Sequence, residues 1–129
     1  MRHLMVLSNV LLVLLAIASS PARASTGNEL LRQCGHALRY IENPGANVVL
    51  VESTFCLGKV SGALDMDALH FNEGAGAFAC PPRGVTTNQA IRVVVGYLER
   101  QPARLHLPAI VLIRDALRDS YPCAAASGR

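Results

Sequence analysis

Clustered positive charge is missing from this sequence of 129 residues. Its twelve Arg and Lys residues stand against nine Asp and Glu and are spread singly along the chain, with Lys59 as the only lysine. Nucleic acids are bound by basic stripes and anionic membrane surfaces by polybasic patches. The sequence therefore predicts no nucleic-acid partner and no electrostatic attachment to a membrane.

Motifs for catalysis and cofactor binding are also missing. The sequence has no glycine-rich phosphate loop and no G-x-S-x-G elbow. Asp67 and His70 share a helix face, but they supply two metal ligands at most, and Glu73 becomes a third only if the helix end bends. His36 is expected at the surface and His106 in a structural turn. We therefore predict no catalytic residue, no cofactor and no metal, and a protein that acts by binding; an enzyme is the weaker alternative.

The longest apolar run lies at the N-terminus. It spans residues 4–18, follows the basic start at Arg2 and precedes the small residues Ala22 and Ala24 of a cleavage site. This order is typical of a secretory signal peptide, and the run is shorter than the roughly 20 residues of a membrane anchor. We predict a signal peptide over residues 1–24, one domain over residues 25–123 and a flexible tail over residues 124–129.

All four cysteines lie outside the predicted signal peptide. An even number of cysteines in a small exported domain predicts two disulfides, each worth about 3 to 4 kcal/mol. A structural zinc site is the alternative, but the spacings include no C-x-x-C pair. The cysteines are Cys34, Cys56, Cys80 and Cys123.

Helical periodicity of the apolar residues predicts four helices. They cover about residues 26–41, a stretch between residues 46 and 69, a third run from the Thr86 cap to Pro102, and a fourth from Pro108 to Tyr121. Residues 48–51 taken alone could form a strand. Because short connections favour antiparallel neighbours, the predicted fold class is all-α, a small four-helix antiparallel bundle with disulfide bonds.

Three pairings of the cysteines are open. In an antiparallel arrangement, the hairpin of the last two helices brings Cys80 near Cys123, and the hairpin of the first two lets Cys34 meet Cys56. Topology alone therefore favours Cys34–Cys56 and Cys80–Cys123.

Three local features refine this prediction. Thr26 and Glu29 have the spacing of a capping box, and so do Thr86 and Gln89. Gly58 and Gly62 each cost the second helix about 1 kcal/mol relative to alanine, and we interpret them as a place where another backbone packs closely. Residues 72–84 form a loop of a length that is often functional. Phe78, its one large apolar residue, either anchors the loop in the core or serves recognition at the surface.

The sequence resembles the Rap/Tai family of type VI secretion immunity proteins. The resemblance rests on "STFCLGKVSGALD" (residues 53–65) and on the segment from Cys80 to Cys123, with its C-x-P-x-G-V-T stretch, Tyr97-Leu98 and the closing Tyr121-Pro122-Cys123. It covers about two thirds of the domain and omits the first helix and residues 72–79. Lys59 stands where the family pattern leads us to expect an aromatic residue.

The resemblance implies a periplasmic, helical, disulfide-bonded protein that binds and inhibits a secreted peptidoglycan amidase effector, often as a homodimer. The matched residues are mainly scaffold, so specificity is expected elsewhere. We hypothesise that the loop after the second helix enters the amidase cleft through Asn72, Glu73 and Phe78, with Arg83 at its base. The alternative is a periplasmic acid-stress chaperone, which exposes apolar surface when carboxylates or histidines are protonated.

Overall fold

The computed structural model of the chain describes residues 24–72, 74 and 76–124. Within these ranges it has four α-helices and no strand, which confirms the predicted all-α fold. The predicted signal peptide, apart from Ala24, and residues 125–129 of the predicted tail lie outside the described residues. The elements are α2 (Gly27–Glu42), α3 (Leu50–Asn72), α4 (Thr87–Arg100), the short 3-10 helix η1 (Pro102–Arg104) and α5 (Ala109–Ser120).

Side-chain caps begin two of the helices as the sequence predicts. Thr26 precedes α2 and accepts a hydrogen bond from the backbone N–H of Glu29. Before α4, the Thr86 hydroxyl accepts from the N–H of Gln89 at 3.2 Å, and the Gln89 side chain accepts from the N–H of Thr86 at 2.8 Å. This reciprocal capping box satisfies amides that a helix start leaves unpaired.

The second helix begins and ends later than predicted. The strand alternative for residues 48–51 is wrong, because α3 already begins at Leu50, and the helix continues to Asn72, three residues beyond the predicted end. Pro108 lies just before α5, at its N-cap, and not within its first turn.

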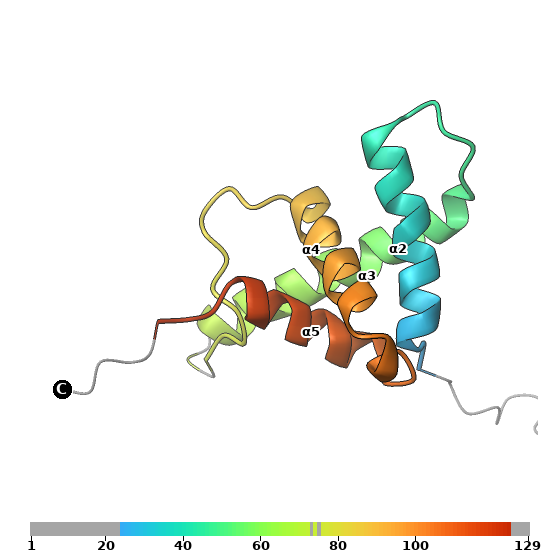
Figure 1. Cartoon of the computed structure of the whole chain (residues 1–129). Coiled ribbons are helices and arrows are strands. Elements are labelled where there is room, and N and C mark those ends of the chain that lie inside the picture. The colour runs from blue at the N-terminus through green and yellow to red at the C-terminus, as the bar shows by residue number, and fades with distance from the viewer. Residues whose placement is uncertain (1–23, 73, 75, 125–129) are drawn as a thin grey trace, which may run out of the picture.

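The core lies where the four helices meet. In Figure 1, α2 and α4 stand upright while α3 and α5 run across them. Leucine, isoleucine and valine side chains from every helix fill the space between them, and the sulfur atoms of one disulfide join them. The largest fully buried side chains are Leu30, Cys34, Cys56, Val60, Ile91, Val94, Leu98, Leu112, Ile113 and Leu117.

The first turn of α2 packs against the chain that precedes α5. The N–H of Gly27 donates to the carbonyl of Leu107 at 2.9 Å, and the N–H of Ala109 donates to that of Ser25 at 2.7 Å. A Cβ atom at Gly27 would lie 2.3 Å from the Leu112 side chain and 2.9 Å from the backbone of Leu105. Only glycine permits this approach, so the start of α2 is held against α5 and the segment that precedes it.

The other glycine prediction is wrong within the chain. A Cβ atom at Gly58 or Gly62 would meet no described atom within 4 Å, so no neighbouring backbone packs there. Both residues are exposed on α3. Their cost in helix propensity is therefore not offset by packing inside the described part of the protein.

Alanine at these positions should have opposite effects. Gly27→Ala is expected to lower the free energy of unfolding by about 1 to 3 kcal/mol, because its methyl group overlaps backbone and Leu112. Gly62→Ala is expected to raise it by about 1 kcal/mol, because the position is helical and open. Urea unfolding of the oxidised protein at low concentration measures both. A stabilising Gly27→Ala substitution would contradict the close approach of α2.

Candidate partner-binding site

The loop between α3 and α4 is held by a buried carboxylate. Asp67, only 4% exposed, accepts hydrogen bonds at Oδ1 from the N–H of Phe78 at 2.6 Å and from that of Ala79 at 3.4 Å. Hydrogen bonds to an ionised acceptor are stronger than neutral ones. Asp67 therefore fixes the loop against α3 instead of serving the metal pair that its spacing to His70 suggested.

The end of α5 holds the same loop from the other side. The structure contains the disulfides Cys34–Cys56 and Cys80–Cys123, the pairing that the antiparallel topology favours. Beside the second of them, the N–H of Cys80 donates to the carbonyl of Tyr121 at 2.8 Å. Figure 1 shows the loop and the C-terminal end of α5 on the same side of the molecule. The disulfide and this hydrogen bond therefore hold the α3–α4 loop against the segment that follows α5.

A groove of about 530 Å³ lies between this loop and the last turns of α3. Of the predicted partner-binding residues, Asn72 and Arg83 both line it and both are exposed. Glu73 lies outside the described residues. The complete lining is Leu64, Asp67, Ala68, Phe71, Asn72, Ala77, Ala79, Cys80, Pro81, Pro82, Arg83 and Val85.

The two phenylalanines near the groove differ in exposure. Phe78 is half-buried and packs against the core, which agrees with an anchoring role for it. Phe71 lines the groove and is 67% exposed. Sequence reasoning missed Phe71, because it ended the helix too early. Helical spacing from the buried Val60 and Asp67 would have placed Phe71 near the buried stripe of α3, but there the helix extends past the core and the ring stays open.

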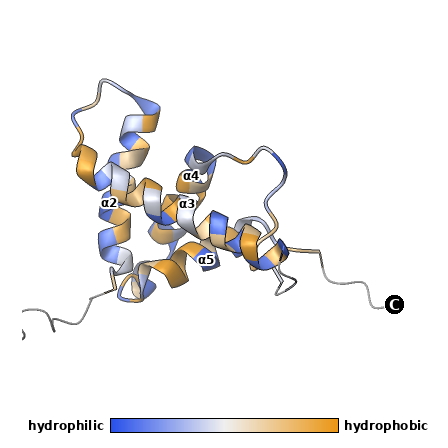
Figure 2. Ribbon diagram, turned by 180° about the vertical axis from the view of Figure 1, so that it is seen from behind, coloured by the Kyte–Doolittle hydropathy of each residue, from blue (hydrophilic) through white to orange (hydrophobic). Residues whose placement is uncertain are grey.

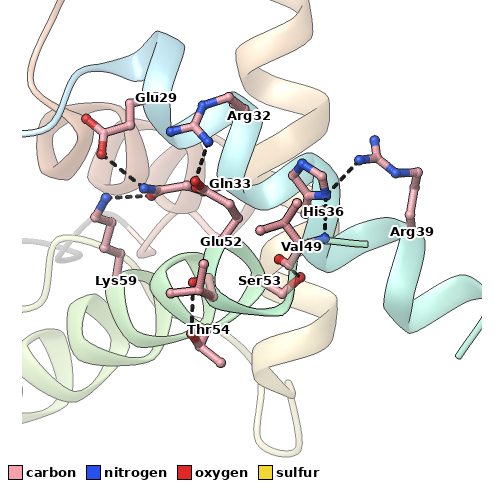
Figure 3. A network of polar contacts seen from close by, with 11 residues as sticks. Glu29, Arg32, Gln33, His36, Arg39, Val49, Glu52, Ser53, Thr54 and Lys59 are labelled. Atoms are coloured by element: carbon pink, nitrogen blue, oxygen red, sulfur yellow. Dashed lines mark hydrogen bonds and ion pairs between the residues drawn. The ribbon is translucent and has the colours of Figure 1, made fainter. Parts of the chain in front are cut away.

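A network of polar side chains connects α2 with α3 (Figure 3). The ammonium of Lys59 donates to Oε1 of the buried Gln33 at 2.6 Å, and Gln33 Nε2 donates to Glu29 at 3.0 Å. Arg32 and Glu52 form an ion pair at 2.5 Å. Lys59, which departs from the family pattern, thus satisfies a buried amide, so the network is a clamp between two helices.

Two histidines and two hydroxyl side chains form hydrogen bonds with the backbone. His36, expected at the surface, is half-buried, and its Nδ1 accepts from the N–H of Val49 at 3.1 Å just before α3. His106 Nδ1 lies 3.1 Å from the carbonyl of Ala103 in the turn where a structural role was predicted. Ser53 donates to the carbonyl of Val49 just before α3, and Thr54 donates to that of Val51 within α3. Within residues 24–72, 74 and 76–124, no three His, Cys, Asp or Glu side chains gather to hold a metal ion.

Two carboxylates are held ionised by arginines. The hydrogen bond from Arg32 lowers the pKa of Glu52, against the desolvation that would raise it. For Asp115, burial alone would raise the pKa, but hydrogen bonds from Arg104 and Arg114 outweigh it and lower the pKa. A depressed folded pKa contributes stability above the unfolded value, about 4 for these groups, and this stability is lost as pH falls through the folded value.

Stability should therefore fall with acidification. We expect the melting temperature to decrease between about pH 5 and pH 3, and Glu52→Gln to reduce that decrease, because its amide does not titrate. Thermal unfolding monitored by circular dichroism across this range measures both. An identical pH profile for Glu52→Gln would contradict the role of the ion pair. An apolar dye added during the titration also tests the chaperone alternative, which requires reversible exposure of apolar surface.

Removing the loop anchor should loosen one segment. Asp67→Ala is expected to lower the free energy of unfolding by about 2 to 3 kcal/mol, because two buried N–H groups lose a charged acceptor. Hydrogen exchange of the Phe78 and Ala79 amides should increase first, while amides in the middle of α4 stay protected. Equal loss of protection throughout the domain would show that Asp67 does not act locally.

The protein is thus a small helical domain with two disulfides. Its groove is held in one conformation by hydrogen bonds and a disulfide, which suits it to binding another protein. The family model of Rap1a immunity proteins matches residues 26–123, and the chain belongs to this family. It is thus an immunity protein, of a kind that binds a cognate effector and is generally not enzymatic. No curated protein and no solved structure shows significant similarity to the chain. None of the helices within the described residues has the length and apolar character needed to cross a bilayer.

Proposed function

We propose that this chain is a periplasmic immunity protein that binds and inhibits a peptidoglycan amidase delivered by type VI secretion. Its family membership supports the immunity role, and the resemblance noted in the sequence supports the amidase target. The predicted signal peptide over residues 1–24 supports export. An amidase of this kind acts on the cell wall, so its inhibitor must be present in the same compartment.

The groove between α3 and the loop carries the proposal. Its rim presents an exposed aromatic ring, Phe71, and an exposed cation, Arg83. Aromatic and arginine side chains dominate the energy of protein interfaces. The rim is supported by the Asp67 hydrogen bonds and by the disulfide Cys80–Cys123. A loop fixed in this way loses little conformational entropy when it binds.

Inhibition then follows from steric exclusion. The loop, with Glu73 and Arg83, and Asn72 at the end of α3 cover the catalytic cleft of the amidase. Phe71 packs against the rim of that cleft. Phe78 holds the loop from inside, because it packs against the core. No covalent step is needed, since a protein bound across the cleft prevents the peptidoglycan strand from entering.

Alanine substitutions at the rim test this proposal. Phe71→Ala and Arg83→Ala are each expected to weaken inhibition of the amidase by at least about tenfold, because both side chains would be buried in the complex. Titration of amidase activity with purified variants gives the inhibition constants. Ile110→Ala is the matched control, since Ile110 is 57% exposed at the other end of α5 from Cys123.

Melting temperatures separate binding from folding. Phe71→Ala and Arg83→Ala should melt within a few degrees of the parent protein, because both positions are exposed. If both variants still inhibit like the parent, the groove is not the amidase-binding surface. If the parent itself inhibits no amidase of a type VI system, the choice of target is wrong.

We propose further that the protein acts as a homodimer, as the resemblance implies. Exposed large apolar side chains on α3 support this, since a monomer gains nothing from keeping them in water.

A further inference from the structure

Large apolar residues recur at every seventh position along one side of α3. Three of the four are between 44% and 67% exposed, and Leu64 is partly buried against the core. Smaller residues occupy the position four further along in each heptad. Because a seven-residue repeat stays on one side of a helix, these residues form a single stripe, which we call the leucine stripe. It consists of Leu50, Thr54, Leu57, Ser61, Leu64, Ala68 and Phe71.

Two hollows lie along the leucine stripe. The groove beside the α3–α4 loop borders the last heptad of the stripe, around Ala68. A second hollow, of about 510 Å³, lies between the start of α3, the end of α2 and the start of α4, and it borders the first heptad, around Thr54. Thr54 and Ala68 are separated by about 21 Å along the helix axis. The stripe therefore offers two places for a large side chain, two heptads apart.

The leucine stripe lies in a recess. Tyr40 of α2 and Ile91 of α4 line the second hollow, and the neighbouring Glu42 and Arg92 join these two helices by an ion pair at 3.3 Å. Pro82 of the loop lines the first hollow. Figure 1 and, from behind, Figure 2 show the end of α2 and the loop on opposite sides of the start of α4. A second copy of the chain presents the same recess, and two recesses do not fill each other. The site therefore suits a protruding element of a different protein.

The polar groups of the stripe can be covered without losing hydrogen bonds. The hydroxyl of Thr54 donates to the carbonyl of Val51 at 2.8 Å, and that of Ser61 donates to the carbonyl of Gly58 at 3.4 Å. A buried donor without an acceptor is costly, but here each hydroxyl hydrogen already has one within the helix. An apolar surface can therefore cover the stripe.

Charges lie beside the leucine stripe and not on it. Glu52 and Lys59 lie on the opposite side of α3, where each binds a side chain of α2. Asp65 is exposed at the margin of the stripe. Arg83 is exposed in the first hollow and has no ion-pair partner among the residues that the structure describes. A complementary partner therefore presents apolar residues to the stripe and a carboxylate to Arg83.

We propose that an amphipathic helix of the cognate effector lies along the leucine stripe and inserts two large apolar side chains, two heptads apart, into the two hollows. A helix fits because its own heptads repeat every 10.5 Å or so, like those of the stripe, whereas alternate residues of a strand repeat at about 7 Å. This inference rests on the effector binding of the proposed function and specifies the segment that binds. The helix forms the rim of the cleft against which Phe71 packs.

A synthetic peptide tests the recess without the effector. It is a stapled, alanine-rich helix of about 25 residues with two phenylalanines fourteen positions apart and a glutamate beside one of them. The control peptide has the same composition, but its phenylalanines are eleven positions apart, which keeps them on one side and shortens their separation by about 4.5 Å. In fluorescence anisotropy with the oxidised protein, we expect the first peptide to bind at least about tenfold more tightly. Equal binding of both peptides, or binding of neither, would overturn the inference.

Variants that fill the hollows test the positions themselves. Thr54→Gln and Ala68→Gln, both at exposed positions, are each expected to weaken binding of the first peptide at least about tenfold, because glutamine takes the space of an anchor without adding charge. Gly62→Gln is the matched control, since it adds the same side chain to an exposed position of α3 outside the stripe. Melting temperatures show that all three variants are folded. Unchanged affinity of Thr54→Gln would show that no anchor enters the second hollow.

Titration of amidase activity separates this inference from the proposed function. Thr54 lies outside the groove beside the loop, so Thr54→Gln should weaken inhibition at least about tenfold only if the effector reaches the second hollow. If Phe71→Ala weakens inhibition and Thr54→Gln does not, the proposed function stands and the helix site is wrong. If the first peptide binds but the protein inhibits no amidase, the helix site stands and the choice of target is wrong. If Thr54→Gln dissociates a dimer in sedimentation velocity and leaves peptide binding unchanged, a second copy occupies the recess and the inference fails.

Discussion

The disulfide between Cys34 and Cys56 is the constraint on which the rest of the structure depends. Both residues are fully buried, and their Cα atoms are 5.0 Å apart, so α2 and α3 must cross at close range. A bond within the core also limits the unfolded chain, which stabilises a domain too small for a large core. With α3 fixed in this way, its buried side and its exposed side have different roles.

The inner side of α3 organises the fold. Glu52 and Lys59 bind side chains of α2, and Asp67 binds the backbone of the loop. These polar groups are partly or wholly removed from water and paired, which makes them more specific than apolar contacts in fixing one arrangement. The same helix therefore clamps α2 at one end and prepares the groove at the other.

The outer side of α3 has no comparable task inside the chain. Its glycines and half-exposed apolar residues only reduce the stability and solubility of an isolated monomer. An immunity protein binds a cognate effector, so apolar surface that is exposed in the free protein is available for such contacts.

Sequence alone determined the local features of this protein. The caps at Thr26 and Thr86, the number of helices and the buried stripe of α4 follow from interactions within a few residues, which tertiary structure did not override. The family also followed from ordered motifs of cysteine, proline and glycine.

Only the tertiary structure decided how these features combine. It showed that Asp67 holds a loop eleven residues away, that Lys59 satisfies Gln33, and that Phe71 continues a buried stripe into open space. It also showed that no backbone packs on Gly58 and Gly62 within the described chain. These outcomes depend on where a helix ends relative to the core and on which groups meet across it. The periodicity of a sequence shows on which face of a helix a residue lies. It shows neither where the helix ends relative to the core nor which groups lie opposite that face.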